Sequence, residues 1–441
     1  MNQYTFARNE KIGLSIGMGL GVICLLLTYI GDDPYHSRFW SNFLHNSVFF
    51  TGIAFLALFL LCAKVIAYSG WHVVFKRIWE AHALFLLMGI LLMLIIIGGV
   101  WLRYHHLYHW AEPEIVLEDE ILSHKSAFLN PLSYTIFTLA ILGVWYYFAR
   151  KMRSFSLAED NVEHYNYSIH KKKTRVWASI FLPLGGFSSA AVIWQWVMSL
   201  DPHWYSTLFA WYCTISWLIA MLCVTVLMIV YLKSKGYFQE VTPNHLHDLG
   251  KYIFGFSIFW AYLWFSQYML IWYGNIGEET IYFKQRIDQY PVLFYSNLGI
   301  NFILPLLILM RNDTKRKIGT MSFISILLIL GHWLDYFLMI KPGVWHAVSG
   351  YQNGESVEGG GHSFQELGSV NHLVSQAGDA AMHGEQAVHF AMGFSIPGLL
   401  ELGTFIGFGA FFTYFVFRQL ERAPLIPLKD PYIDESLHHH V

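Results

Sequence analysis

The sequence predicts an all-α integral membrane protein with ten transmembrane helices, and three observations lead to this fold class. Of the 441 residues, 55% are hydrophobic and only 13% are charged, whereas soluble domains carry about 25% charged residues. The apolar residues gather in ten runs of roughly 20 residues, the length that spans a bilayer. Lys and Arg concentrate in alternate connecting segments, which is typical of a multi-pass membrane protein.

The ten predicted spans are residues 12–30, 43–67, 81–102, 131–148, 176–198, 208–232, 252–273, 290–310, 318–340 and 396–417. The first is too long for a signal peptide and lacks a small-residue cleavage pattern, so we expect it to be retained. The four cysteines all lie inside apolar runs, where we expect packing residues rather than disulfides or metal ligands: Cys24, Cys62, Cys213 and Cys223.

Basic residues predict that the N-terminus and the tail 418–441 are cytoplasmic, because this orientation places most of the 28 Lys and Arg inside. The best marker is the segment 150–175.

On the outside lie an acidic loop, 112–125, and a long Gly- and His-rich loop, 342–395, which we expect to dock an external partner. Its histidines are irregularly spaced, which favours a docking surface over a metal site: His346, His362, His372, His383 and His389. A net charge of −2 gives no argument for nucleic acid.

Ionisable residues at membrane depth are costly and indicate function. His332 and Asp335 share one face of span nine, Glu401 lies in span ten, and Gln267 and Tyr268 interrupt the apolar span seven. Burial brings a carboxyl group and an imidazole toward their neutral forms, which suits both to pass protons. The alternative is that such residues only join helices or sit at the interface. It applies more strongly to residues near span ends: Gln195, Asp201 and His203 outside, and Glu80, His82, His245, His247 and Asp248 inside.

The sequence contains no cysteine pattern for an iron–sulfur cluster or covalent haem and no nucleotide-binding loop. His332 is expected to be the single deep histidine, which argues against a haem with two axial histidines. We therefore expect no redox cofactor, no metal and no catalytic residue in this chain. The aromatic residues of span seven are expected to pack or to line the interface rather than to hold a quinone ring: Trp260, Trp264, Trp272 and Tyr273.

The segment FWAYLWFSQYMLIWYGNIGEET, residues 259–280, resembles the hallmark span of the membrane subunits of bacterial alternative complex III. These subunits belong to the superfamily of NrfD and the polysulfide-reductase membrane subunits. Three further segments resemble the ActF type of subunit rather than its quinol-binding sister type: SLDPHWYSTLFAWY (199–212), GHWLDYF (331–337) and the C-terminal ESLHHHV. The three histidines at the end are therefore read as native.

The resemblance implies a single ten-span domain, 1–441, in the bacterial inner membrane. Spans two to five (43–198) and six to nine (208–340) would form two four-helix bundles, and the first and last spans would be peripheral. The implied partners are a multihaem cytochrome c, an iron–sulfur protein, the quinol-binding sister subunit and small membrane subunits. A terminal oxidase is a further candidate, and bound lipids are expected. Haem c, iron–sulfur clusters and quinol would reside in those partners.

In this reading the chain is a non-catalytic subunit of a quinol:electron acceptor oxidoreductase. It would scaffold the complex and carry a proton path through Gln267, Tyr268, His332, Asp335, Glu401 and Asp201, with Glu80, His82 and Asp248 as inner candidates. Two alternatives remain. The chain could oxidise quinol itself at the outer face, with Gln195, Asp201 and His203 as the site. It could instead be an independent secondary transporter with a broken helix at Pro183-Leu184-Gly185-Gly186.

Overall fold

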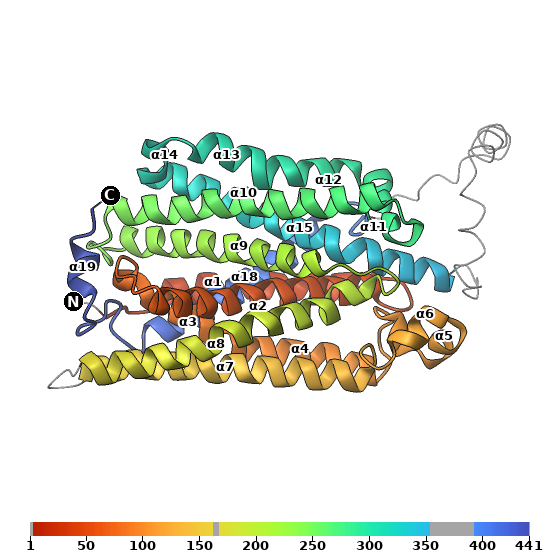
Figure 1. Cartoon of the computed structure of the whole chain (residues 1–441), viewed down its shortest axis with the longest axis horizontal. Helices are drawn as coiled ribbons and strands as arrows, with labels where there is room; N and C mark the ends of the chain where they lie inside the picture. Colours follow the sequence, from red (N-terminus) through yellow and green to blue (C-terminus); the bar gives the residue numbers. More distant parts are fainter. Residues whose placement is uncertain (1–2, 162–166, 353–391, 441) are drawn as a thin grey trace.

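The computed structural model describes residues 3–161, 167–352 and 392–440. Ten of its helices are long and apolar enough to cross a membrane, and they run side by side along one axis (Figure 1). The described residues contain no strand, only two isolated bridges. The predicted class, an all-α multi-pass membrane protein with ten spans, is therefore confirmed. The centre of the expected His-rich loop, with His362, His372, His383 and His389, lies outside the described residues.

Most spans are single helices, and two are interrupted. In chain order they are α1 (Arg8–Ile30), α2 (Ser37–Ile66), α3 with α4 (Lys76–Leu84 and Leu86–Trp101), α7 (Pro131–Asn161), α8 (Tyr167–Trp196), α9 (Thr207–Ser234), α10 (Pro243–Gly274), α12 with α13 (Pro291–Leu298 and Leu304–Leu309), α15 (Ile318–Gln352) and α18 (Leu399–Leu420). A 3₁₀ turn, η1 (Val73–Phe75), precedes α3, and a π turn, η4 (Gly299–Ile303), joins α12 to α13.

Several helices extend beyond the apolar runs, because Lys, Arg, Glu and Gln are good helix formers outside the membrane as well. α7 and α8 both extend into the basic segment 150–175, which connects predicted spans four and five. α10 begins at Pro243, where Thr242 and His245 form a reciprocal cap. α15 continues past residue 340, the expected end of span nine, and reaches Gln352 with Pro342 inside it.

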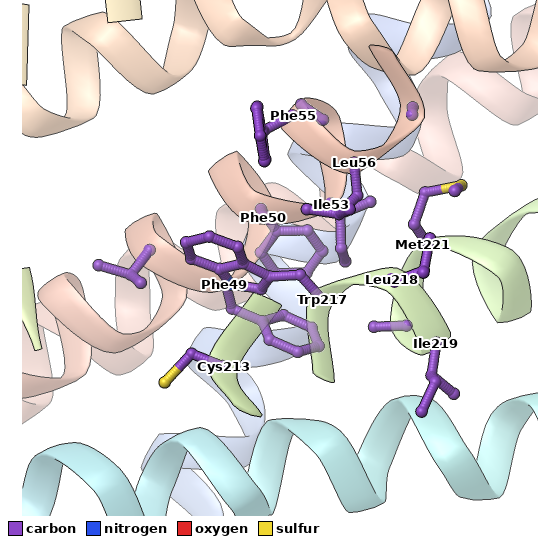
Figure 2. Packing of buried hydrophobic residues seen from close by; sticks show 14 of the residues in the cluster. Phe49, Phe50, Ile53, Phe55, Leu56, Cys213, Trp217, Leu218, Ile219 and Met221 are labelled. Atoms are coloured by element: carbon purple, nitrogen blue, oxygen red, sulfur yellow. The ribbon is translucent and has the colours of Figure 1, made fainter. Parts of the chain in front are cut away.

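The centre of the molecule is formed by α2, α9 and α15, which are the most buried spans. α2 packs against α9 and against α15. Three further helices pack around α2, namely α3, α4 and α8, and α10 packs against α9. Figure 2 shows the α2–α9 interface, where Phe49 and Ile53 face Trp217 and Met221. Gly52 of α2 is required here, because a side chain at this position would overlap the Trp217 ring. All four cysteines are free and buried.

α1 and α18 form a close pair at the edge of the molecule. A Cβ atom added to Gly21 of α1 would lie 2.5 Å from the Gly407 Cα of α18, and one added to Gly17 would lie 2.9 Å from the Ala410 Cβ. Small residues spaced by four let the two backbones approach closely, which is how apolar helices associate in lipid. The rest of α1 is largely exposed, as expected for a lipid-facing helix.

Both chain termini lie at the same end of the helices, here called the terminal end (Figure 1). Gln3 pairs with Pro424, and the tail helix α19 (Ile433–Leu437) packs on η1. The opposite end carries α5 (Pro113–Glu118), α6 (Glu120–Lys125) and α11 (Gly277–Gln289). The acidic loop 112–125 is thus largely helical.

Candidate functional site

Asp335 of α15 is a fully buried carboxylate with four side-chain donors. Its Oδ1 accepts hydrogen bonds from the Asn297 Nδ2 at 2.7 Å and from the Tyr212 hydroxyl. Its Oδ2 accepts from the Trp260 Nε1 at 3.0 Å and from the Ser216 Oγ at 3.1 Å. The donors come from α9, α10 and α12, so four spans converge on one carboxylate. Donors in this number stabilise a buried negative charge.

His332 lies one helical turn before Asp335 and reaches the same serine. The His332 Nδ1 is 2.9 Å from the Ser216 Oγ. Because the Ser216 hydroxyl donates to Asp335, its oxygen is left to accept a hydrogen bond from the His332 Nδ1–H. In a neutral imidazole the Nε2 is then a bare acceptor. This atom is buried and has no hydrogen-bond partner among the described residues, so the chain His332–Ser216–Asp335 has one end open for a proton.

The π turn η4 carries Asn301, which extends this site beyond Asn297 of α12. The Asn301 Nδ2 donates to the Asn297 Oδ1 at 2.6 Å, and Asn297 in turn donates to Asp335. Gly331 of α15 leaves room for Asn301, because a side chain there would overlap the Asn301 amide. A π turn adds one residue to a helical turn and re-aims the side chains that follow, and such turns are frequent at functional sites.

A second polar group runs along one face of α2. Arg38 binds Glu401 of α18 through two hydrogen bonds, Nε to Oε1 at 2.7 Å and Nη2 to Oε2 at 2.9 Å. The Asn42 Nδ2 donates to the same Oε1 at 2.9 Å, and the backbone N–H of Gly398 donates to Oε2 at 2.8 Å. Glu401 is therefore held in a fixed ion pair, apart from Asp335.

Trp333 connects this second group to α15. The Trp333 Nε1 donates to the Asn46 Oδ1 at 3.1 Å, and the His45 Nε2 is 2.9 Å from the Trp333 backbone oxygen. Further along the same face, the Lys341 Nζ donates to the Ser41 Oγ at 2.7 Å. α15 thus presents His332 and Asp335 to α9 and Trp333 to α2. The expectation that His332 is the single deep histidine is wrong, because His45 is equally buried.

Gln267 and Tyr268 do not join Asp335 in any hydrogen bond between described residues. The Gln267 Nε2 is buried without a partner among the described residues. The Tyr268 ring stacks on Trp264 with centroids 6.2 Å apart and meets Phe283 edge-on at 5.3 Å. Trp260 was expected to be a packing residue, yet it donates to Asp335. Trp272 and Tyr273 are exposed, as interfacial residues would be.

The three outer candidates contact three different partners. The Arg286 Nη2 donates to the Asp201 Oδ2 at 3.1 Å, the Gln195 Nε2 is 3.4 Å from the Ser133 Oγ, and His203 bonds to Asp119 of the loop between α5 and α6. Burial opposes the charge of Asp119, but the bond from His203 lowers its pKa below the usual range. The side chains do not converge on a shared pocket among the described residues.

The inner candidates are likewise separate. Glu80 of α3 is buried between Arg153 at 2.6 Å and Arg77 at 3.4 Å. His82 faces the Met228 Sδ at 3.1 Å. The Asp248 Oδ2 is 2.6 Å from the His439 Nε2 of the tail and its Oδ1 is 2.5 Å from the Lys251 Nζ. The tail bonds also to His245, whose Nε2 is 3.0 Å from the Ser436 backbone oxygen.

Sequence reasoning missed several site residues that carried a common signal. Polar pairs four residues apart interrupt otherwise apolar spans, which places both members on one helix face. Such pairs occur in α9, across α12 and η4, and twice in α2: Tyr212 with Ser216, Asn297 with Asn301, Arg38 with Asn42, and Asn42 with Asn46. Lys341 comes directly after the apolar run that contains Asp335, and it has no polar partner four residues away that would have marked it in the sequence.

Comparison with known proteins gives no further assignment, because no protein-family model and no curated protein matches the chain. Within residues 3–161, 167–352 and 392–440, no group of three or more His, Cys, Asp or Glu side chains could hold a metal ion.

Proposed function

We propose that the chain is an ActF-type membrane subunit of an alternative complex III, a quinol:electron acceptor oxidoreductase, and that it conducts protons through the site at Asp335. One observation carries the proposal. The three interior segments with the family resemblance are far apart in the sequence and meet at one carboxylate. Segment 331–337 supplies Asp335 itself, and Tyr212 of 199–212 and Trp260 of 259–280 donate to it. His332 of 331–337 reaches it through Ser216.

The proposed proton transfer uses only these side chains. A proton arrives at the His332 Nε2, the Nδ1–H proton passes to the Ser216 oxygen, and the Ser216 hydroxyl proton passes to the Asp335 Oδ2. The result is a neutral His332, an unchanged Ser216 hydroxyl and a protonated Asp335. Each donor and acceptor in this sequence lies within 3.1 Å of the next.

The proposal assigns the redox chemistry to the partner subunits and none to this chain. It includes two four-helix bundles, 43–198 and 208–340, with α1 and α18 at their edge. The packing of α3, α4 and α8 around α2, and of α10 and α15 against α9, supports this layout. The terminal end would face the cytoplasm of a bacterial cell, because basic residues gather there. The opposite end would then meet the multihaem cytochrome and the iron–sulfur protein.

The identity of the complex is tested by its composition. The full chain, purified with its native partners from membranes, is expected to bring down a multihaem cytochrome c, an iron–sulfur protein and a second large membrane subunit. Mass spectrometry and the haem absorption spectrum identify these partners. Recovery of the chain with a different set of subunits would contradict the assignment to this complex.

The proton path is tested at Ser216, the link between His332 and Asp335. Ser216→Ala removes the hydroxyl but leaves both titratable groups, so proton translocation should fall by tenfold or more while quinol oxidation continues. Ser216→Thr keeps a hydroxyl and should retain translocation. Thr225→Ala, which removes another buried hydroxyl of α9, is the matched control. Equal translocation in the wild type and Ser216→Ala would refute this path.

A further inference from the structure

A cavity of about 40 Å³ lies at the terminal end, between α2, α8 and the tail. This is several times the space that one water molecule needs. Four basic side chains line it, two from α2 and α3 and two from α8: Lys64, Lys76, Lys171 and Arg175. None of the residues assigned to the proton path around Asp335 lines this cavity.

Two of the four cations are matched by carboxylates. Asp430 of the tail binds Lys76 and lies 3.3 Å from the Lys171 Nζ, and Glu159 lies 3.7 Å from both lysines. Glu80, which also lines the cavity, is matched by Arg77 and Arg153. The inner wall of the cavity is therefore close to electroneutral.

The other two cations have no carboxylate within 4.0 Å among the described residues. Lys64 donates to the Tyr252 hydroxyl and lies over the Trp71 ring, with its Nζ 5.0 Å from the centroid. Arg175 donates to the Tyr68 hydroxyl, and its guanidinium lies 4.6 Å from the Tyr68 ring centroid. Aromatic rings and hydroxyls hold both cations in place without neutralising them.

The backbone at the cavity mouth is strained. Tyr68 has a φ of 53°, a left-handed conformation that is unusual for a bulky residue. Its side chain is 55% exposed and holds Arg175 at the surface. Strain of this kind persists where the surrounding structure enforces it, and it concentrates at ligand sites.

We propose that this cavity binds a phosphate group between Lys64 and Arg175, with the Tyr68 hydroxyl beside it. A guanidinium and an ammonium group are the usual ligands of phosphate, the first through a fork of donors and the second as a point charge. The bound group is either the phosphate of an anionic phospholipid or free phosphate. Basic pockets between helices at the membrane surface commonly hold lipid head groups.

The test uses the full-length chain, purified in detergent and stripped of lipid. It is titrated with dioctanoyl phosphatidylglycerol, with the zwitterionic dioctanoyl phosphatidylcholine and with inorganic phosphate, and binding is followed by native mass spectrometry and thermal unfolding. The variant is Lys64→Gln with Arg175→Gln. The control is Lys172→Gln with Lys173→Gln, which removes the same charge from exposed residues of the same helix end.

Phosphatidylglycerol should bind the wild type and the control alike, and the cavity variant at least about tenfold more weakly, because two charged hydrogen bonds are lost. Weaker binding of phosphatidylcholine and phosphate identifies a lipid as the ligand. Phosphate binding of equal strength, with the same dependence on Lys64 and Arg175, identifies free phosphate. Binding that is equal in the cavity variant and the control, or no binding of any probe, overturns the proposal.

Discussion

Arg286 of α11 supplies the hydrogen bond that Pro342 withholds from α15. The Arg286 Nε donates to the Leu338 carbonyl at 3.0 Å. Leu338 is four residues before Pro342, which has no N–H to offer it. The Arg286 Nη2 also bonds the Met339 carbonyl at 3.3 Å and Asp201 at 3.1 Å. This single side chain explains how α15 continues past a proline and why Asp201 is engaged at this end of the helices.

Arg286 and Pro342 should therefore be energetically coupled. Arg286→Met leaves a buried carbonyl unpaired and should lower the free energy of unfolding by about 1–3 kcal/mol. Pro342→Ala restores the backbone N–H, so it should stabilise the Arg286→Met chain more than the wild type. Thermal unfolding of the four chains measures the coupling. An equal effect of Pro342→Ala in both backgrounds would show that Arg286 does not satisfy Leu338.

The contact between α1 and α18 should be sensitive to single methyl groups. Gly21→Ala places a Cβ 2.5 Å from the Gly407 Cα, so the two helices must separate. The free energy of unfolding should therefore fall by about 1–3 kcal/mol. Gly19→Ala, two residues away, meets nothing within 4 Å and should be neutral or stabilising by about 0.5–1 kcal/mol. Thermal unfolding compares them. If the two variants are equally stable, close backbone packing does not hold α1.

Arg38 and Glu401 should behave as a buried pair. Glu401→Gln removes the carboxylate that pairs with Arg38 and should lower the free energy of unfolding by up to about 3 kcal/mol. This is the lower part of the range for breaking a buried pair, because the Arg38 side chain is 18% exposed. Replacing both residues with Met should cost less than Glu401→Gln alone. A double replacement that costs as much as the sum of the single ones would contradict the pairing.

Apolar periodicity predicts the ten spans, because helix length and hydrophobic thickness are directly linked. It also brings His332 and Asp335 together, since residues three apart share a helix face. It does not predict that Asn297, Tyr212 and Trp260 meet Asp335, because contacts between spans depend on how whole helices pack. Glu401 looked similar to Asp335 in the sequence, but its environment differs. Arg38 lies 363 residues away in the sequence and is brought beside Glu401 only by the contact between α2 and α18.

The tail should detach when Asp430 loses its charge. Burial opposes that charge, but Lys76 and Lys171 outweigh it and hold the pKa of Asp430 below its usual range. The folded pKa is thus lower than the unfolded value of about 3.9. The ion pairs therefore contribute stability above about pH 4, and this contribution is lost as the pH falls below that value.

Asp430→Asn should reproduce the acid state at neutral pH. Hydrogen exchange of the tail amides, corrected for intrinsic rates, should be faster in Asp430→Asn at pH 7, and in the wild type only below about pH 4. Asp434→Asn, an exposed carboxylate of the same tail, is the control and should leave exchange unchanged. A tail that is fully protected in Asp430→Asn would show that other contacts, such as that between Ser436 and Trp71, suffice.

The most direct test of the account is the number of protons translocated per electron by the complex with Asp335→Asn, reconstituted in vesicles. Asparagine keeps the size of the side chain but cannot take up a proton. We expect Asp335→Asn to oxidise quinol at close to the wild-type rate. Its ratio of protons to electrons should be lower, because the translocated protons are missing from it. Asp335→Glu should restore the wild-type ratio. A wild-type ratio in Asp335→Asn, with the variant fully assembled, would contradict the central claim that protons pass through Asp335.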